Sequence, residues 1–85
     1  MRSFHYVIRD KAGIHARPAG TIVKEAKKYS SQILVKKGEA QADAAHLMQL
    51  MSMGIRCGDE ISVEVSGKDE EAAGAAMEKV FRENL

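Results

Sequence analysis

The sequence predicts one α+β domain built as a two-layer, open-faced sandwich with the element order β-α-β-β-α-β-α. Some stretches alternate apolar and polar residues with the period of a half-buried strand, and others repeat apolar residues with the period of an amphipathic helix. The 85 residues suffice for one core and contain no repeat, linker or low-complexity tract, so we expect residues 1–85 to form a single domain. Strands that alternate with helices favour two layers, with the polar face of the sheet left to solvent.

The first half of the chain is expected to form a strand, a helix and a hairpin. Phe4, Tyr6 and Ile8 share one face of a strand near residues 3–8. A helix is predicted from Ala16 to about Tyr29, because apolar residues recur there at helical spacing: Ala19, Ile22, Val23 and Ala26. A strand at 32–37, a turn at 37–39 and a returning strand at 40–43 predict an antiparallel hairpin.

The second half is expected to form a short helix, a strand and a final helix. Leucine and methionine dominate residues 46–53, which is too apolar for a short helix with a single buried face. We expect Leu50 inside, Met48 and Met51 exposed, and Leu47 in either place. Residues 60–66 alternate as a strand, and Asp69, Glu70 and Glu71 suit the N-terminus of a helix. The buried stripe of that final helix is predicted to be Ala73, Ala76, Met77, Val80 and Phe81.

A histidine lies at residue 15, where a loop turns into the first helix. Gly13 permits a tight backbone entry and Pro18 is tolerated in a first helical turn, so His15 should lie at or beside the N-cap. The free N–H groups of Ala16 and Arg17 and the positive end of the helix dipole then form an anion site around a neutral, nucleophilic ring. The planar fork of Arg17 suits phosphate oxygens. This pattern predicts reversible phosphorylation on a ring nitrogen of His15.

Each of these features also has an ordinary interpretation. A histidine near a helix start is usually a surface or capping residue, and an arginine there is usually a solvated one. The convergence of Gly13, the helix start and Arg17 on His15 favours the phosphate site over both.

Residues 13–19 resemble the active-site signature of the HPr family, the histidine-containing phosphocarriers of the bacterial sugar phosphotransferase system. The resemblance covers nearly the whole chain through an ordered set of segments, at residues 23–27, 51–54 and 58–61. It implies a four-stranded antiparallel sheet covered on one face by three helices. It also implies a carrier rather than an enzyme: His15 takes a phosphoryl group from Enzyme I and passes it to the IIA domains of sugar permeases, and Arg17 contacts phosphate and partner.

The same resemblance implies a docking surface that donor and acceptor proteins share. Its candidate residues in this chain are Gly20, Lys24, Lys27, Leu47, Met48, Met51 and Arg56. For the two lysines, solubilising charge is nearly as plausible a role.

The chain departs from the family pattern at the start of the second helix. Many HPr proteins carry there a serine that an ATP-dependent kinase modifies, whereas this chain has His46. An imidazole cannot replace the hydroxyl as acceptor, so this regulation is not carried over. Gly20 and Gln49 also differ from the commoner residues beside the docking surface, which affects partner affinity rather than the transfer chemistry.

Composition excludes several other classes of protein. Thirteen Lys and Arg against twelve Asp and Glu give a net charge of +1, which provides no general attraction to nucleic acid or membrane. Two Phe, two Tyr and no Trp offer few stacking platforms for RNA. The single Cys57 and three histidines lack metal-ligand spacing, and no cofactor is expected. We expect a cytoplasmic location, since the sequence contains no signal peptide or membrane span. We also expect a monomer.

Two alternatives differ in function. An HPr-like regulatory paralogue would signal carbon or nitrogen status through its phosphorylation state, and the presence of His15 is compatible with that role. A small hydrolase of similar topology, such as an acylphosphatase-like enzyme, would need a water-positioning asparagine. The only asparagine, Asn84, lies beside the C-terminus, which disfavours the hydrolase.

Overall fold

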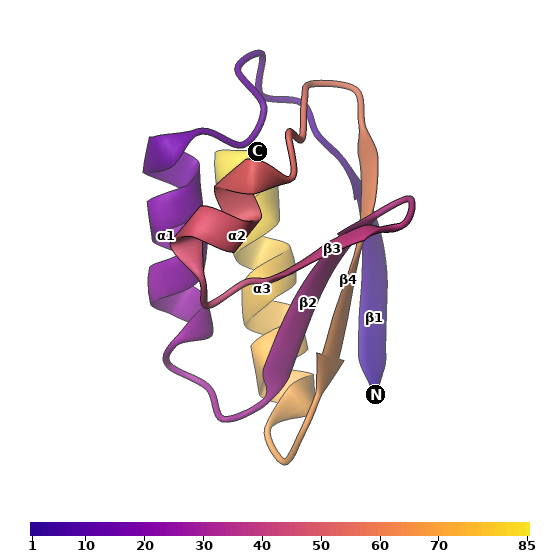
Figure 1. Cartoon of the computed structure of the whole chain (residues 1–85). Coiled ribbons are helices and arrows are strands. Elements are labelled where there is room, and N and C mark those ends of the chain that lie inside the picture. The colour runs from indigo at the N-terminus through magenta and orange to yellow at the C-terminus, as the bar shows by residue number, and fades with distance from the viewer.

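The computed structural model describes all residues 1–85 and shows a four-stranded sheet with three helices on one face (Figure 1). The elements are β1 (Arg2–Val7), α1 (Ala16–Ala26), β2 (Gln32–Lys37), β3 (Ala40–Asp43), α2 (Leu47–Ser52), β4 (Glu60–Ser66) and α3 (Glu70–Asn84). The strands are ordered β1-β4-β2-β3, and every neighbouring pair is antiparallel. The predicted fold class and element order are confirmed.

The side chains of the sheet alternate between the helices and solvent, as the period of two requires. Val35 and Val63 are directly opposed in the register of β2 and β4, and both are fully buried. On the other face Lys36 and Glu64 form an ion pair of 3.0 Å between the same two strands. The apolar face of the sheet therefore supplies one side of the core, and the polar face remains uncovered.

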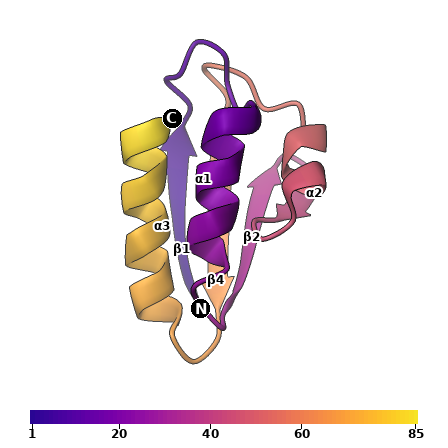
Figure 2. The same ribbon diagram turned by 90° about the vertical axis from the view of Figure 1, so that its left-hand side faces the viewer.

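The three helices lie side by side over this apolar face (Figure 2). Each contributes large buried side chains: Ile22 from α1, Leu50 from α2, and Met77 and Phe81 from α3. Burial of one such side chain contributes about 1.5–3 kcal/mol. The Phe81 ring also meets the rings of Phe4 and Tyr6 edge-on, at centroid distances of 5.9 and 6.0 Å.

The first helix is shorter than predicted, ending at Ala26 rather than near Tyr29. The N–H of Lys27 still reaches the carbonyl of Val23, four residues back. The N–H groups of Lys28 and Tyr29 instead bond to carbonyls three residues back, on Glu25 and Ala26. The last turn tightens in the way that commonly ends an α-helix, which apolar spacing alone does not reveal.

The buried stripe of α3 also differs from the prediction. Ala73, Met77 and Phe81 are buried, whereas Ala76 and Val80 are only partly covered. Gly74 joins the buried set because the Arg2 side chain crosses it: a Cβ at residue 74 would lie 2.7 Å from Arg2 Nε and closer still to Arg2 Cδ. A larger residue at 74 would therefore have to displace the Arg2 side chain where β1 approaches α3.

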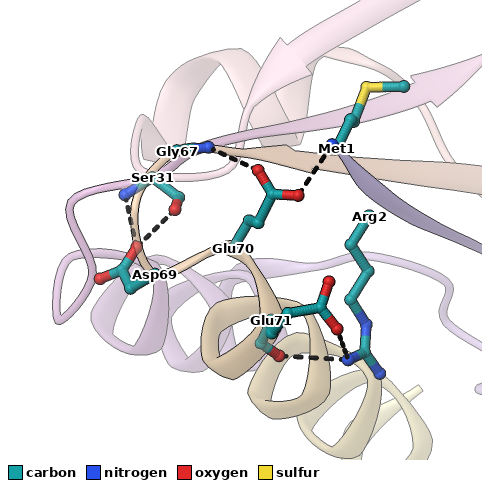
Figure 3. A network of polar contacts seen from close by, with 7 residues as sticks. All are labelled: Met1, Arg2, Ser31, Gly67, Asp69, Glu70 and Glu71. Atoms are coloured by element: carbon teal, nitrogen blue, oxygen red, sulfur yellow. Dashed lines mark hydrogen bonds and ion pairs between the residues drawn. The ribbon is translucent and has the colours of Figure 1, made fainter.

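The acidic residues at the start of α3 bond to other parts of the chain (Figure 3). Asp69 is the N-cap of α3, but its carboxylate caps no N–H of its own helix. It accepts instead from the N–H groups of Ser30 and Ser31, both at 2.9 Å, and from the Ser31 hydroxyl. Led by the hydroxyl, these bonds lower the pKa of Asp69. Asp69 thus fastens the α1–β2 connection to the beginning of α3.

Candidate active site

His15 occupies the N-cap of α1, as predicted, and its side chain makes no hydrogen bond. Its backbone is extended, with φ −121° and ψ −177°, and its carbonyl accepts the N–H of Ala19 at 2.9 Å. The ring makes no capping hydrogen bond, and 44% of the side chain is exposed. The histidine thus holds the start of the helix through its backbone alone, which leaves the imidazole available to a ligand or another protein.

The first turn of α1 presents free donors beside this ring. The N–H groups of Ala16 and Arg17 have no acceptor within the protein, and Pro18 has no N–H to offer. The side chain of Arg17 is exposed and unpaired, and only its carbonyl is engaged, by the hydroxyl of Thr21. Two backbone donors, the positive end of an eleven-residue helix and a free guanidinium favour an anion at this end of α1.

Asp10 is a neighbour of His15 that the sequence reasoning missed. Its Oδ1 lies 3.8 Å from Nε2 of His15 and accepts the N–H of Ala12 at 2.8 Å. The carbonyl of Asp10 accepts the N–H of Gly13 at 2.9 Å, which closes a β-turn. Aspartate at the first position of a turn and glycine at the fourth is a recognisable turn signature, and it could have indicated that Asp10 begins a turn before His15.

The loop that carries Asp10 is held at both sides by distant segments. The N–H groups of Arg9 and Asp10 donate to the Leu85 carbonyl at the end of α3, at 2.6 and 2.7 Å. Arg9 Nη2 also donates to the Arg82 carbonyl, and the guanidinium stacks over the Tyr6 ring. The start of α1 and the end of α3 accordingly lie at the same end of the molecule (Figure 1).

Residues 54–59 support the loop from the other side. Gly13 has a φ of +68°, and a Cβ there would lie 2.8 Å from Arg56 Cα and closer still to the Ile55 oxygen. That oxygen accepts the N–H of Ile14 at 3.1 Å. Asp59 fixes the supporting segment, because Lys37 Nζ and the N–H of Arg56 both bond to its carboxylate and hold its pKa below the usual range.

The candidate docking residues are all exposed, on α1, on α2 and on the loop after α2. Gly20, Lys24 and Lys27 share one face of α1, since they are four and three residues apart. On α2 the exposed side chains are Met48 at 77%, Leu47 at 39% and Met51 at 37%, whereas Leu50 is fully buried. Leu47 is therefore on the outside of the helix. Arg56 is exposed as well.

His46 is the N-cap of α2 and takes part in a local polar network. Its ring makes no capping bond, and Nδ1 lies 3.0 Å from Nε2 of Gln49. Gln49 Oε1 in turn accepts the N–H of Asp43 at 3.1 Å, while Asp43 Oδ1 accepts the N–H of Ala45. Gln49 and Asp43 thus order the segment before α2, although neither accepts from an N–H group in the first turn of the helix.

No helix is long and apolar enough to cross a bilayer, and no cluster of three or more His, Cys, Asp or Glu residues is arranged around a metal position. The chemistry on offer is that of a nucleophilic imidazole beside an anion-binding helix end. Such a site can accept a phosphoryl group without a cofactor, because the donors stabilise the oxygens and the ring supplies the electron pair.

Comparisons with known proteins point to the same chemistry. The family model described as the PTS HPr component phosphorylation site matches residues 2–83. The phosphocarrier protein HPr of Mycoplasma genitalium is 40% identical over 85 residues, covering 99% of this chain and 97% of the relative. That of Mycoplasma capricolum is 39% identical over 81 residues, covering 95% and 91%. A solved mycoplasma histidine-containing phosphocarrier protein superposes with a TM-score of 0.94 at 36% identity, covering 96% of this chain and 93% of the other.

Proposed function

Because the chain belongs to the HPr family of phosphocarrier components of the phosphotransferase system, we propose that it accepts a phosphoryl group on His15 from phosphorylated Enzyme I and delivers it to the IIA domains of sugar permeases. The observation that carries this proposal is the partly exposed ring of His15, which makes no hydrogen bond at the N-cap of α1 and lies beside the free N–H groups of Ala16 and Arg17. The nucleophilic ring and the donors that bind a phosphoryl anion therefore lie at the same end of α1.

We take Nδ1 of His15 as the nitrogen that becomes phosphorylated. Nε2 faces the Asp10 carboxylate at 3.8 Å, which favours a proton on Nε2 and leaves the lone pair on Nδ1. That lone pair forms the new N–P bond, while the electron pair of the old N–P bond returns to the donor's ring. Transfer onward reverses this order, with the pair of the Nδ1–P bond returning to His15.

The few donors at the site suit a carrier. A dense cationic cage would stabilise the phosphorylated form and hinder its release to the next protein. Two backbone N–H groups and the exposed, unpaired guanidinium of Arg17 supply orientation and partial neutralisation instead. Transfer from protein to protein also needs rapid dissociation, which fits a small docking surface on α1 and α2. This mechanism needs no second copy of the chain, and we expect a monomer.

The experiment is to incubate the protein with Enzyme I and phosphoenolpyruvate and to measure its intact mass. We expect a gain of one phosphoryl group that is lost in acid, and no gain in His15→Ala. The matched controls are His5→Ala and His46→Ala, which remove the other two histidines, both exposed, and should charge normally. Labelling that survives in His15→Ala, or that resists acid, would assign the acceptor elsewhere.

A second step separates the carrier from a regulatory paralogue. Addition of a IIA domain to the charged protein should return its mass to the starting value while the IIA domain gains the phosphoryl group. A protein that charges on His15 but never discharges to any IIA domain is a signalling module rather than a carrier.

A further inference from the structure

We propose that Asp10 is a positioning residue for phosphoryl transfer, whose charge keeps a proton on Nε2 of His15 so that the ring departs from phosphorus as a neutral imidazole. The inference rests on the function proposed above and adds a residue to its mechanism. It starts from the distance of 3.8 Å between Asp10 Oδ1 and His15 Nε2, the one carboxylate–histidine pair within 4.0 Å in the molecule.

Asp10 is held in place by contacts that do not involve His15. Its N–H donates to the Leu85 carbonyl at 2.7 Å, its carbonyl accepts from Gly13, and its Oδ1 accepts from Ala12 at 2.8 Å. Backbone and side chain are thus both fixed, and the carboxylate is only one-third exposed, at 32%. The charge next to Nε2 is therefore preorganised rather than carried by a freely rotating surface side chain.

Several cations also lie around this end of α1, while the one other carboxylate of the supporting segment, Asp59, is engaged by Lys37 and the N–H of Arg56. Lys11 precedes Gly13 in the loop, Arg17 follows His15 in α1, and Arg56 lies in the segment against Gly13. The α3 end contributes the Leu85 carbonyl, which is occupied by Arg9 and Asp10. The three cations favour a bound phosphoryl group but disfavour a proton on the ring, and Asp10 is the group that offsets this effect at Nε2.

The separation shows how Asp10 acts. At 3.8 Å the contact is too long for a hydrogen bond, so the effect of Asp10 depends on the charge of its carboxylate rather than on an acceptor atom.

The charge matters most in the phosphorylated state. With phosphorus on Nδ1 and a proton on Nε2, the ring is cationic and Asp10 balances it. When an acceptor attacks phosphorus, the Nδ1–P bond breaks, its electron pair returns to Nδ1, and a neutral ring remains with its proton still on Nε2. No other component then needs to supply or remove a proton. Without the proton on Nε2, the departing group would be an imidazolate, which is a far poorer leaving group.

The test compares Asp10→Asn with Asp10→Ala. Asparagine retains an oxygen acceptor for the N–H of Ala12 but removes the charge, whereas alanine removes both. Each protein is phosphorylated chemically with phosphoramidate, which needs no Enzyme I, and the phosphorylated ring is titrated by following its proton and nitrogen resonances. Both variants should lose the Nε2 proton at a lower pH than wild type, and their transfer to a IIA domain above that lower midpoint should be slower than that of wild type.

Asp43→Asn is the matched control, because Asp43 Oδ1 accepts the N–H of Ala45 in the same kind of turn at the same 2.8 Å, away from His15. Its titration midpoint should equal that of wild type. Wild-type behaviour of Asp10→Asn together with altered behaviour of Asp10→Ala would reduce Asp10 to a turn residue and overturn the proposal, as would wild-type behaviour of both. Failure of Enzyme I to charge the wild type would instead contradict the proposed function, since the titration does not depend on it.

Discussion

Replacement of Gly13 by alanine tests how the loop before His15 is held. The residue has a φ of +68°, and its missing Cβ would sit 2.8 Å from Arg56 Cα and closer still to the Ile55 oxygen. Both neighbours are backbone atoms, so neither relieves the contact by rotating a side chain. Gly54 and Gly20 provide matched comparisons: Gly54 has a φ of +66° with nothing within 4 Å, and Gly20 has open space and no positive φ.

The three alanine substitutions should change the free energy of unfolding by amounts that differ in size and in sign. The positive φ costs about 1–2 kcal/mol in a residue with a Cβ. Displacement of Ile55 also weakens the bond of 3.1 Å from the Ile14 N–H, which contributes about 1 kcal/mol. Gly13→Ala should therefore lower the free energy of unfolding by about 2–3 kcal/mol and Gly54→Ala by about 1–2 kcal/mol, so that Gly13→Ala loses about 1 kcal/mol more. Gly20→Ala should raise it by about 0.5–1 kcal/mol, because alanine favours a helix interior.

The assay is urea unfolding followed by circular dichroism, with linear extrapolation to water. A chain of this length has a total stability of about 4–13 kcal/mol, so all three variants remain folded enough to measure. Gly13→Ala should also charge more slowly on His15, because the loop and the helix start shift together. Equal losses for Gly13→Ala and Gly54→Ala would refute the reasoning, since the close approach to residues 55 and 56 would then contribute nothing.

Three further predictions concern the phosphate site, the docking surface and the pH dependence of stability. Arg17→Ala should slow phosphoryl transfer without abolishing it, because the backbone donors remain, and Arg17→Lys should recover part of the rate in the same transfer assay. Met48→Glu should raise the Michaelis constant of Enzyme I for the protein with little change in melting temperature. The control is Val7→Glu, at an exposed apolar residue on the uncovered sheet face, which should change neither partner kinetics nor fold. Unfolding of the Met48 variant would instead place that side chain in the core. The lowered pKa of Asp69 means that its bonds to Ser31 stabilise the fold above the ordinary value of 3.8 and are lost as the pH falls through the lowered value. The difference in free energy of unfolding between wild type and Asp69→Asn should therefore be constant near neutrality and shrink in acid. A difference that does not depend on pH would contradict this assignment.

Much of the candidate site could be predicted because it is local in the chain. The glycine, histidine, arginine and proline at residues 13–18 specify a helix start with free donors, and the structure places His15 at the N-cap of α1. His46 is likewise the N-cap of α2. Asp10 was missed although it is only five residues from His15, since a turn signature shows that the chain reverses but not which side chain the turn brings against the ring.

The sequence by itself determined the order of the elements and most of their buried faces, because apolar periodicity depends on the residues of one segment, but it missed the end of α1 and the partial exposure of Ala76 and Val80. It did not determine which segments meet. The order β1-β4-β2-β3, the bonds from Arg9 and Asp10 to Leu85, the packing of residues 55 and 56 against Gly13, and the reach of Asp69 to Ser31, 38 residues away, were decided only in the tertiary structure. The physical reason is that burial drives an apolar face toward any apolar partner, whereas strand register, loop closure and hydrogen-bond geometry select one partner among several.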